Sequence, residues 1–494
     1  MDLVQINHFI GGQEVGVDAT SRFETINPSN GKAYASVAHG DASDVDTAVA
    51  NCAQTFAEGA WSKMPPAERS AVLSKIGDII LTRINFLALL ESRDSGKPII
   101  NARRDVMRAS SLMKYFATLP EIAIGANFSE EPGYHSYSTR VPFSVVGSIV
   151  PWNLPFLFAA WKSAPAIALG SSVVLKPSEE TSASAIEFAR ICIDAGLPPG
   201  VVNVVLGDGK TGAALVDHPK VEMISFTGST YVGRKILQAA SSRLKGVHLE
   251  LGGKSANIVF ADADLDKAVE ATLFSSYWNT GQICTSGTRL LLADEIADEF
   301  IKRLSVRLRD ADLVGDPSLT TTQIGPVISK RQFEKVQSYI SLAVEEGAEL
   351  VFGGNTPTIK DCEDGFFINP TLFKNASPKM RVAQEEIFGP VTVAMTFSSE
   401  SEAVEIANST QFGLAAAIWT QDIARAHRIA EQLTAGIIWT NCINRIRWNI
   451  PYEGHGVSGM GEDLGVECIK TFSKLKVNQI NFSGNPNVSF PVSA

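Results

Sequence analysis

The stretch Val145-Val146-Gly147-Ser148-Ile149-Val150-Pro151-Trp152-Asn153-Leu154-Pro155-Phe156 changes character halfway along. Its first half is apolar and rich in β-branched residues, which indicates a buried strand. Two prolines then bracket a turn, and a helix-like apolar run begins at residue 156. The same order of strand and helix recurs downstream, with strands expected at 172–175, 201–206 and 223–226 and helices from residues 181 and 230. This alternation predicts an α/β fold with a doubly wound parallel sheet. Such sheets bind ligands at the carboxyl ends of their strands, and the expected ligand is a dinucleotide.

The segments around this core show other patterns. Residues 1–40 alternate short apolar runs with Gly and Asn-Pro turns, which predicts strands, and residues 41–116 have helical periodicity with a break at 96–98. A second α/β alternation follows, with strands at 255–260 and 289–292, a helix to residue 277 that Asp264 caps, and a helix at 296–308. Residues 121–140 look irregular and polar, and residues 471–481 look like a final strand whose edge another subunit would cover.

Composition excludes several classes of protein. The 494 residues are 45% hydrophobic and 19% charged, which is typical of a globular chain with a large core. The formal charge of −10 argues against a general nucleic-acid binder. We find no apolar run long enough for a membrane span and no leader at the first residues, so a cytoplasmic protein is expected. Six scattered cysteines indicate reduced thiols, and the seven histidines show no metal-ligand spacing, so no metal is expected.

One cysteine stands out by its surroundings. Cys284 lies in a loop flanked by Gly281 and Gly287, which let the backbone approach a bound molecule closely. We interpret it as a nucleophile, which requires a group that takes its proton. Glu250 is the candidate, because its apolar and glycine neighbours indicate partial burial, which raises a carboxyl pKa towards the range useful for a base.

The motifs together resemble the aldehyde dehydrogenase superfamily. A glutamate before Leu-Gly-Gly-Lys precedes the cysteine loop, and five further motifs occur in the family's order, at 151–156, 176–179, 226–230, 385–390 and 458–461. The resemblance implies an NAD-binding domain at 1–120 and 141–252, a second α/β catalytic domain at 253–470, and a small β oligomerisation element at 121–140 and 471–494. It also implies a homodimer or homotetramer.

The implied reaction is NAD-dependent oxidation of an aldehyde to a carboxylic acid. Cys284 would attack the carbonyl and form a thiohemiacetal, with Asn153 and the Cys284 backbone amide donating to the oxyanion. Hydride transfer to NAD would leave a thioester, which water activated by Glu250 would hydrolyse.

The resemblance also implies a set of cofactor contacts. Glu179 can accept both hydroxyls of the adenosine ribose and repels a 2′-phosphate, which favours NAD over NADP. The pyrophosphate is expected at Ser229 and the helix through Gly233, more than at the G-x-G-x-x-G stretch of residues 207–212, which matches the fingerprint alone. The expected cofactor residues are Pro151, Trp152, Lys176, Ser178, Glu179, Gly209, Phe226, Gly228, Ser229, Gly233, Leu251, Glu386 and Phe388.

Substrate choice is the most open question. Trp161, Trp278 and Tyr452 are similar to the aromatic box of betaine and aminoaldehyde dehydrogenases, which attracts ammonium groups, although Leu154 departs from it. Arg108, Arg445 and Arg447 instead favour an aldehyde with an acid group and an aromatic or unsaturated body, as in the muconic semialdehyde branch. The expected substrate residues are Arg108, Leu154, Trp161, Trp278, Ile283, Thr285, Arg445 and Tyr452. Glu453 and Gly456 differ from the residues that the family carries in its last loop, so the resemblance does not predict the shape of the substrate entrance.

Two other functions are compatible with the same fold. An acylating enzyme would pass the thioester to coenzyme A or phosphate, but it does not need the retained Glu250. A catalytically silent structural protein would be expected to have lost a catalytic group, whereas Cys284, Glu250 and Asn153 are all present.

Overall fold

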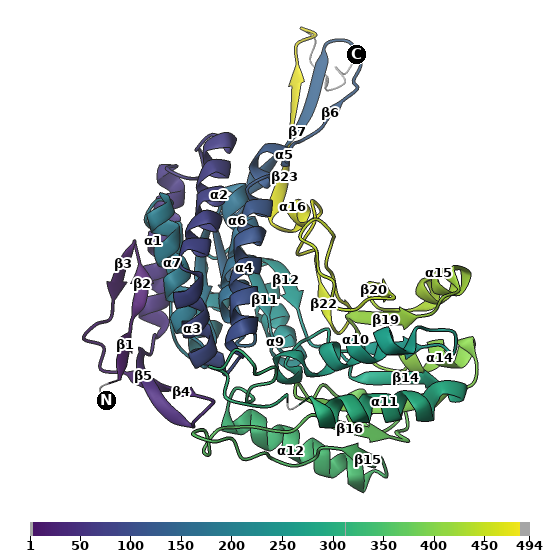
Figure 1. Cartoon of the computed structure of the whole chain (residues 1–494). Helices are drawn as coiled ribbons and strands as arrows, with labels where there is room; N and C mark the ends of the chain where they lie inside the picture. The colour runs from purple at the N-terminus through teal and green to yellow at the C-terminus, as the bar shows by residue number, and fades with distance from the viewer. Residues whose placement is uncertain (1–2, 312, 485–494) are drawn as a thin grey trace.

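Two large bodies and a thin projecting arm make up the molecule (Figure 1). They are seen in a computed structural model that describes residues 3–311 and 313–484. Each body is built on one large sheet, and the arm is a three-stranded sheet of its own. No helix in the described ranges combines the length and the apolar character that crossing a membrane requires.

The first body contains an eight-stranded sheet in the order β22-β12-β11-β8-β9-β10-β2-β3. Its centre is parallel and confirms the predicted alternation: β8 (Val145–Ile149), β9 (Ser172–Lys176), β10 (Val202–Val204), β11 (Met223–Thr227) and β12 (Gly246–Glu250). The connecting helices are α6 (Pro155–Leu169), α7 (Ala183–Ala195), α8 (Gly209–Asp217) and α9 (Thr230–Ser241). The antiparallel edges, β2 (His8–Ile10), β3 (Gln13–Val15) and β22 (Gly459–Met460), come from distant parts of the chain.

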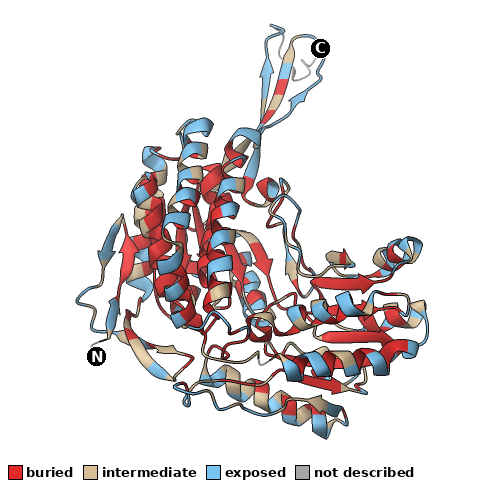
Figure 2. Ribbon diagram, viewed as in Figure 1, coloured by how far each residue is buried: buried red, intermediate tan, exposed pale blue. Residues whose placement is uncertain are grey.

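The periodicity of residues 41–116 is confirmed by α1 (Ala42–Glu58), α2 (Pro66–Thr82), α3 (Ile84–Ser95) and α4 (Ile99–Phe116), which the short α5 (Leu119–Ile122) follows. Helix α1 packs with α8 against one face of the sheet, whereas α2, α3 and α4 pack on α6 and α7, which cover the opposite face. The predicted break is confirmed, since Gly96 ends α3 in a left-handed conformation and Pro98 precedes α4. Helix α6 is buried along its whole length (Figure 2). Strands β1 (Val4–Ile6), β4 (Arg22–Asn27) and β5 (Lys32–Ala38) form a separate small sheet.

The second body contains a seven-stranded sheet in the order β15-β16-β17-β14-β13-β19-β20. The strands are β13 (Ala256–Val259), β14 (Arg289–Ala293), β15 (Glu349–Phe352), β16 (Thr371–Lys374), β17 (Val391–Phe397), β19 (Ala415–Trp419) and β20 (Ile437–Thr440). The helices are α10 (Leu265–Tyr277), α11 (Ala297–Asp310), α12 (Lys330–Glu345), α13 (Arg381–Gln384), α14 (Glu400–Asn408) and α15 (Ile423–Gln432). The predicted cap is confirmed, because the Asp264 carboxylate accepts a hydrogen bond from the Lys267 amide at 3.2 Å.

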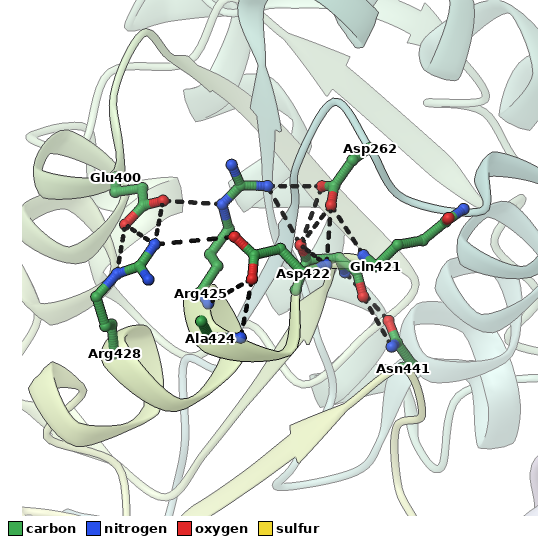
Figure 3. Close-up of polar contacts among 9 residues, drawn as sticks. Asp262, Glu400, Gln421, Asp422, Ala424, Arg425, Arg428 and Asn441 are labelled. Atoms are coloured by element: carbon green, nitrogen blue, oxygen red, sulfur yellow. Dashed lines mark hydrogen bonds and ion pairs between the residues drawn. The ribbon is translucent and has the colours of Figure 1, made fainter.

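A polar network ties three elements of the second body together at one end of its sheet (Figure 3). Asp262, beyond β13, accepts hydrogen bonds from the Thr420 hydroxyl and from the backbone amides of Gln421 and Asp422. Arg425 of α15 bridges Asp262 at 2.7 Å and Glu400 of α14 at 2.9 Å. Because these groups all pair with one another, the network holds the ends of α14 and α15 against the sheet.

The arm consists of β6 (Asn127–Phe128), β7 (Tyr134–Pro142) and β23 (Ser473–Asn481), in the order β23-β7-β6. The expectation that residues 121–140 are irregular was therefore wrong, because β7 gains its order from pairing with β23 over the full length of both strands. The final strand is confirmed, although Thr471 belongs to the preceding α16 (Cys468–Thr471). Residues 485–494 of the expected oligomerisation element lie outside the described residues.

Four short elements complete the fold. Strands β18 (Phe412–Gly413) and β21 (His455–Gly456) pair with each other, and the short helices η1 (Trp278–Gly281) and η2 (Asp294–Ile296) flank β14. Element η1 leads directly into the loop that carries Cys284.

Candidate active site

Cys284 lies half-buried in the loop between η1 and β14. Glycines on neighbouring segments make room for it: a Cβ on Gly253 would lie 2.3 Å from the Cys284 carbonyl oxygen, and one on Gly281 would lie 2.2 Å from the carbonyl of Gly389. The Cys284 Sγ faces the Tyr452 hydroxyl at 3.7 Å. Gly281, which the sequence singled out, and Gly253 therefore let neighbouring backbone segments approach the cysteine loop closely.

Burial determines the charge state of this cysteine. It raises the pKa of the Cys284 thiol to about 12, the nearby Glu250 carboxylate raises it further, and the hydrogen bond with Tyr452 opposes both effects. The thiol is consequently protonated at neutral pH in this arrangement. Nucleophilic attack at that pH requires a group that removes the proton.

Glu250 is the last residue of β12 and is buried, as its neighbours predicted. Desolvation raises the pKa of its carboxyl well above the ordinary range, the charges of Asp463 and Glu453 act in the same direction, and Lys162 opposes them. Its Oε1 has no hydrogen-bond partner within the described part of the chain. Burial therefore favours the protonated form of this carboxyl group, and the carboxylate is a strong proton acceptor once it forms.

A cluster of buried polar groups lies behind Glu250. The Lys162 ammonium is 2.5 Å from Asp463 Oδ2 and 3.5 Å from His248 Nδ1. Possible ligand atoms of His248, Glu250 and Asp463 lie within 4.8 Å of one another, a grouping that the sequence did not reveal. The Lys162 ammonium already supplies the positive charge beside these carboxyl groups, which leaves a metal cation little to neutralise.

Asn153 occupies the turn that enters α6 and is buried. Its Nδ2 donates a hydrogen bond to the Gln282 carbonyl at 2.9 Å, and its backbone carbonyl accepts one from Asn279 Nδ2 at 3.0 Å. The turn of the first body is thus bonded directly to the cysteine loop of the second. No sequence pattern indicated the roles of Asn279 and Gln282 in this junction, because more than one hundred residues separate them from Asn153.

All eight expected substrate residues line one cavity of about 190 Å³ above Cys284. Aromatic rings form its walls: Trp161 lies edge-on to Tyr452 with ring centroids 5.7 Å apart, and Trp278 stacks on Phe274 at 5.5 Å. The cavity also includes residues that the sequence analysis did not name, namely Arg104, Phe158, Phe274, Asn444 and Ile446. The structure therefore brings the predicted residues together and adds a cationic group.

Two features hold Arg108 at the cavity. Its guanidinium lies 3.6 Å from Asp105 and over the ring of Trp448, 5.3 Å from the ring centroid. The Trp448 indole N–H donates to the Ser111 hydroxyl at 2.9 Å, which fixes the ring. Trp448 was missed because only the fold brings its loop against α4.

The expected cofactor residues follow the carboxyl ends of neighbouring strands. Pro151 and Trp152 follow β8, Lys176 ends β9, and Gly228 follows β11. Other members lie near them: Ser178 and Glu179 continue from Lys176, whose ammonium is 3.8 Å from the Glu179 carboxylate, and Phe226 is within β11. Since parallel strands end at a common edge, these residues form a continuous rim where a ligand can bind.

The start of α9 suits an anion. The Ser229 hydroxyl accepts a hydrogen bond from the Val232 amide and caps the helix, and a Cβ on Gly233 would lie 2.5 Å from Leu251 Cδ2. The buried Thr227 Oγ1 at the same strand end has no partner among the described residues. Helix amides and an unpaired hydroxyl fit a pyrophosphate. Gly209, by contrast, is the first residue of α8, with open space around its Cβ position, and its role stays a prediction.

Glu386 and Phe388 reach this region from the second body. The Glu386 Oε1 accepts a hydrogen bond from the Gly253 amide at 3.0 Å. Phe388 has a positive φ of 60° and lies edge-on to Trp152, with ring centroids 5.2 Å apart. A strained backbone at a non-glycine residue persists only where its surroundings hold it in place, so this contact joins the two bodies beside the expected cofactor rim.

Known proteins match this chain along nearly all of its length. The profile of the aldehyde dehydrogenase family matches residues 16–478. A betaine aldehyde dehydrogenase from Sinorhizobium fredii is 40% identical over 471 residues, which cover 95% of this chain and 96% of that protein.

Solved structures agree. The structure of PnpE in complex with nicotinamide adenine dinucleotide matches this chain with a TM-score of 0.95 at 39% identity, over 98% of this chain and 99% of that one. A further structure of PnpE, from Pseudomonas sp. WBC-3, also matches. An indole-3-acetaldehyde dehydrogenase in complex with NAD⁺ matches with a TM-score of 0.94 at 36% identity, over 97% of each chain. The chain belongs to the aldehyde dehydrogenase family and is an NAD-dependent oxidoreductase that acts on aldehydes.

Proposed function

We propose that this enzyme oxidises an aldehyde with an aromatic or unsaturated body and a distal acid group, through a covalent intermediate on Cys284. The observation that carries the proposal is the cavity above Cys284, which combines aromatic walls with Arg104, Arg108 and Arg445. Arg104 and Arg445 have no carboxylate partner among residues 3–311 and 313–484. A substrate carboxylate would provide that partner, and a cation would be repelled.

The chain's own residues can perform each chemical step. Once Glu250 is ionised, it can take the Cys284 proton, either directly or through water, and the thiolate attacks the carbonyl carbon to form a thiohemiacetal. The oxyanion accepts hydrogen bonds from the second N–H of Asn153 and from the Cys284 amide. After oxidation, the thioester on the sulfur is hydrolysed by water that gives its proton to Glu250. The carboxylic acid is released and the thiol is restored.

We assign the cofactor to the rim formed by the ends of β8, β9 and β11. Lys176 and Glu179 would hold the adenosine ribose, the N-terminus of α9 the pyrophosphate, and Glu386 and Phe388 the nicotinamide end. NAD supplies, when bound, the acceptor for the hydride that the thiohemiacetal carbon releases. The unpaired Thr227 hydroxyl and the dipole at the N-terminus of α9 support this assignment.

An ammonium-bearing aldehyde is the second candidate. Trp161 and Tyr452 form part of an aromatic enclosure, and the Sinorhizobium fredii relative is a betaine aldehyde dehydrogenase. A ring face attracts a cation by about 0.5 to 2 kcal/mol, whereas a charge-assisted hydrogen bond to a guanidinium contributes about 1.5 to 3 kcal/mol. Because Leu154 replaces one wall of the enclosure with an aliphatic side chain, we favour the acidic substrate. Release of the acyl group to coenzyme A is disfavoured, because Glu250 is retained.

We also propose that the domains follow the expected boundaries, 1–120 with 141–252, then 253–470, with 121–140 and 471–494 as the oligomerisation element. Strand β23 is an outer strand of the arm, and its Leu475, Val477 and Ile480 side chains are exposed. A second copy of the chain would cover this edge in a homodimer or homotetramer.

The direct test is NADH formation, followed by absorbance, with wild-type enzyme and a panel of aldehydes. The panel contains a benzaldehyde, a muconic semialdehyde-like acid, a neutral aliphatic aldehyde and betaine aldehyde. We expect the highest kcat/KM with the acidic unsaturated or aromatic members. Preference for betaine aldehyde would reject the substrate assignment, and acid production only in the presence of coenzyme A would reject the hydrolytic step.

A further inference from the structure

The loop before Cys284 contains three consecutive residues in the left-handed region of backbone space. The φ angles are 51° at Asn279, 59° at Thr280 and 69° at Gly281. Glycine adopts this conformation without cost, but a β-branched threonine is a marked outlier. Strained residues of this kind cost about 1 to 3 kcal/mol each and persist only where neighbouring contacts compensate. Strong restraints therefore act on this loop.

Side chains supply those restraints. The Thr280 hydroxyl donates to the Gly325 carbonyl at 3.0 Å, and the Gln282 side chain donates to the Asn279 carbonyl at 3.1 Å and accepts from the Ile328 amide at 2.9 Å. The side chains of Asn279, Thr280 and Gln282 are all buried. These contacts hold the loop to its own body but do not fix it relative to the turn that carries Asn153.

Asn279 makes the connection between the bodies. Its Nδ2 donates to the Asn153 backbone carbonyl at 3.0 Å and lies 3.4 Å from the Gln282 carbonyl, which also accepts a bond from Asn153 Nδ2 at 2.9 Å. Two carboxamides thus cross between the turn and the loop in opposite directions. The Gln282 carbonyl where they meet is two residues before Cys284. We propose that Asn279 is a positioning residue, which keeps the Asn153 amide and the Cys284 sulfur in register for attack on a carbonyl.

The inference rests on the proposed function, because it assumes that Cys284 attacks and that Asn153 donates to the oxyanion. Misplacement of reacting groups by about 1 Å costs on the order of 100-fold in rate. Loss of the Asn279 carboxamide should therefore slow acyl transfer about 10- to 100-fold. The sulfur itself stays in place through Gln282 and Thr280, so its reactivity towards a reagent that needs no oxyanion donor should be kept.

The test compares two reactions of the same thiol in the full-length protein. With p-nitrophenyl acetate, the thiolate attacks the ester carbonyl, a C–S bond forms, and the C–O bond breaks to release p-nitrophenolate, which requires oxyanion stabilisation. With iodoacetamide, the thiolate displaces iodide at a saturated carbon and needs none. The variants are Asn279→Gly, which allows the left-handed backbone but removes the donor, and Asn279→Asp, which keeps the shape. Asn375→Gly is the matched control, because Asn375 has a φ of 56° at an exposed turn.

We expect both Asn279 variants to be acylated at least 10-fold more slowly than wild type, with alkylation within about twofold and the control unchanged on both measures. Acylation within twofold of wild type would overturn the proposal. A parallel fall of acylation and alkylation, together with a lower Tm, would mean a purely structural role and would also overturn it. Failure of the proposed function is distinct, because wild-type protein would then show no Cys284-dependent acylation at all.

Discussion

Replacement of Glu250 by glutamine tests the assigned base with little change in packing. The two side chains have nearly the same shape, and Glu250 Oε1 has no hydrogen-bond partner within the described residues that the change would remove. General-base catalysis contributes about 100- to 10,000-fold to a rate, which corresponds to roughly 3 to 5 kcal/mol. We therefore expect Glu250→Gln to lower kcat by that factor. The thioester on Cys284 should accumulate, because its hydrolysis becomes the slow step.

Stopped-flow absorbance separates the two half-reactions. Wild-type enzyme should form NADH at a steady rate that increases with pH through the raised pKa of Glu250, because only the carboxylate accepts a proton. Solvent base can still form the thiolate, so the Gln variant should give a burst of up to one NADH per subunit, followed by a slow phase that lacks this pH dependence. A variant that retained kcat within threefold of wild type, or that kept the pH profile, would refute the assignment.

The same carboxyl makes a prediction about stability. Its folded-state pKa lies above the ordinary value of 4.5, so the folded state retains a proton that the unfolded state releases. Stability from this group must fall as pH rises from about 4.5 towards the folded pKa, by up to about 1.4 kcal/mol per pH unit. Urea unfolding of wild type and Glu250→Gln across this window should show the smaller pH dependence in the variant, and equal slopes would contradict the burial argument.

Three further predictions concern the cavity, the loop and the arm. Arg108→Ala should raise KM for acidic aldehydes about 10-fold or more and leave KM for neutral aldehydes nearly unchanged. Arg103 is exposed on the same helix, so Arg103→Ala should change neither KM value. Equal effects of Arg108→Ala on both classes of aldehyde would contradict the selectivity. Gly253→Ala should destabilise the fold by about 1 to 3 kcal/mol and reduce activity, because the added Cβ would lie 2.3 Å from the Cys284 carbonyl oxygen. Thermal unfolding measures the loss of stability, and an unchanged Tm would refute the steric argument. Val477→Glu places a charge on the exposed edge of β23 and should lower the molecular mass in sedimentation experiments, whereas an unchanged mass would place the interface elsewhere.

The sequence predicted the architecture well where hydrophobic patterns are local. The strands of both parallel sheets follow from short β-branched runs between helical segments, and the Asp264 cap follows from its position before an amphipathic run. The pattern failed at β7, where polar side chains hide a strand that its partner β23 stabilises. It predicted strands within residues 1–40, but not that β2 and β3 would join the first sheet at one edge while β22 forms the other. Such pairings depend on contacts between distant segments, which no window of sequence contains.

The substrate cavity shows the same division. Motifs identified Trp161, Trp278 and Tyr452, and the structure gathers them above the cysteine. Arg104 and Trp448 carried no motif. Arg104 lines the cavity, and Trp448 supports Arg108 there only because α4 and a distant loop meet. The environment of Glu250 was predictable in direction, since apolar neighbours indicate burial, but the Lys162 and Asp463 pair beside it required the fold.

The central claim is that the acyl group is carried by Cys284, and mass spectrometry of the acid-quenched enzyme tests it directly. Glu250→Gln enzyme is mixed with NAD and an aldehyde, digested, and searched for the acyl mass. We expect the adduct on the peptide that contains Cys284, dependent on NAD and absent from the Cys284→Ala, Glu250→Gln double variant. An adduct on another cysteine, or NADH formation by Cys284→Ala at the wild-type rate, would contradict the mechanism.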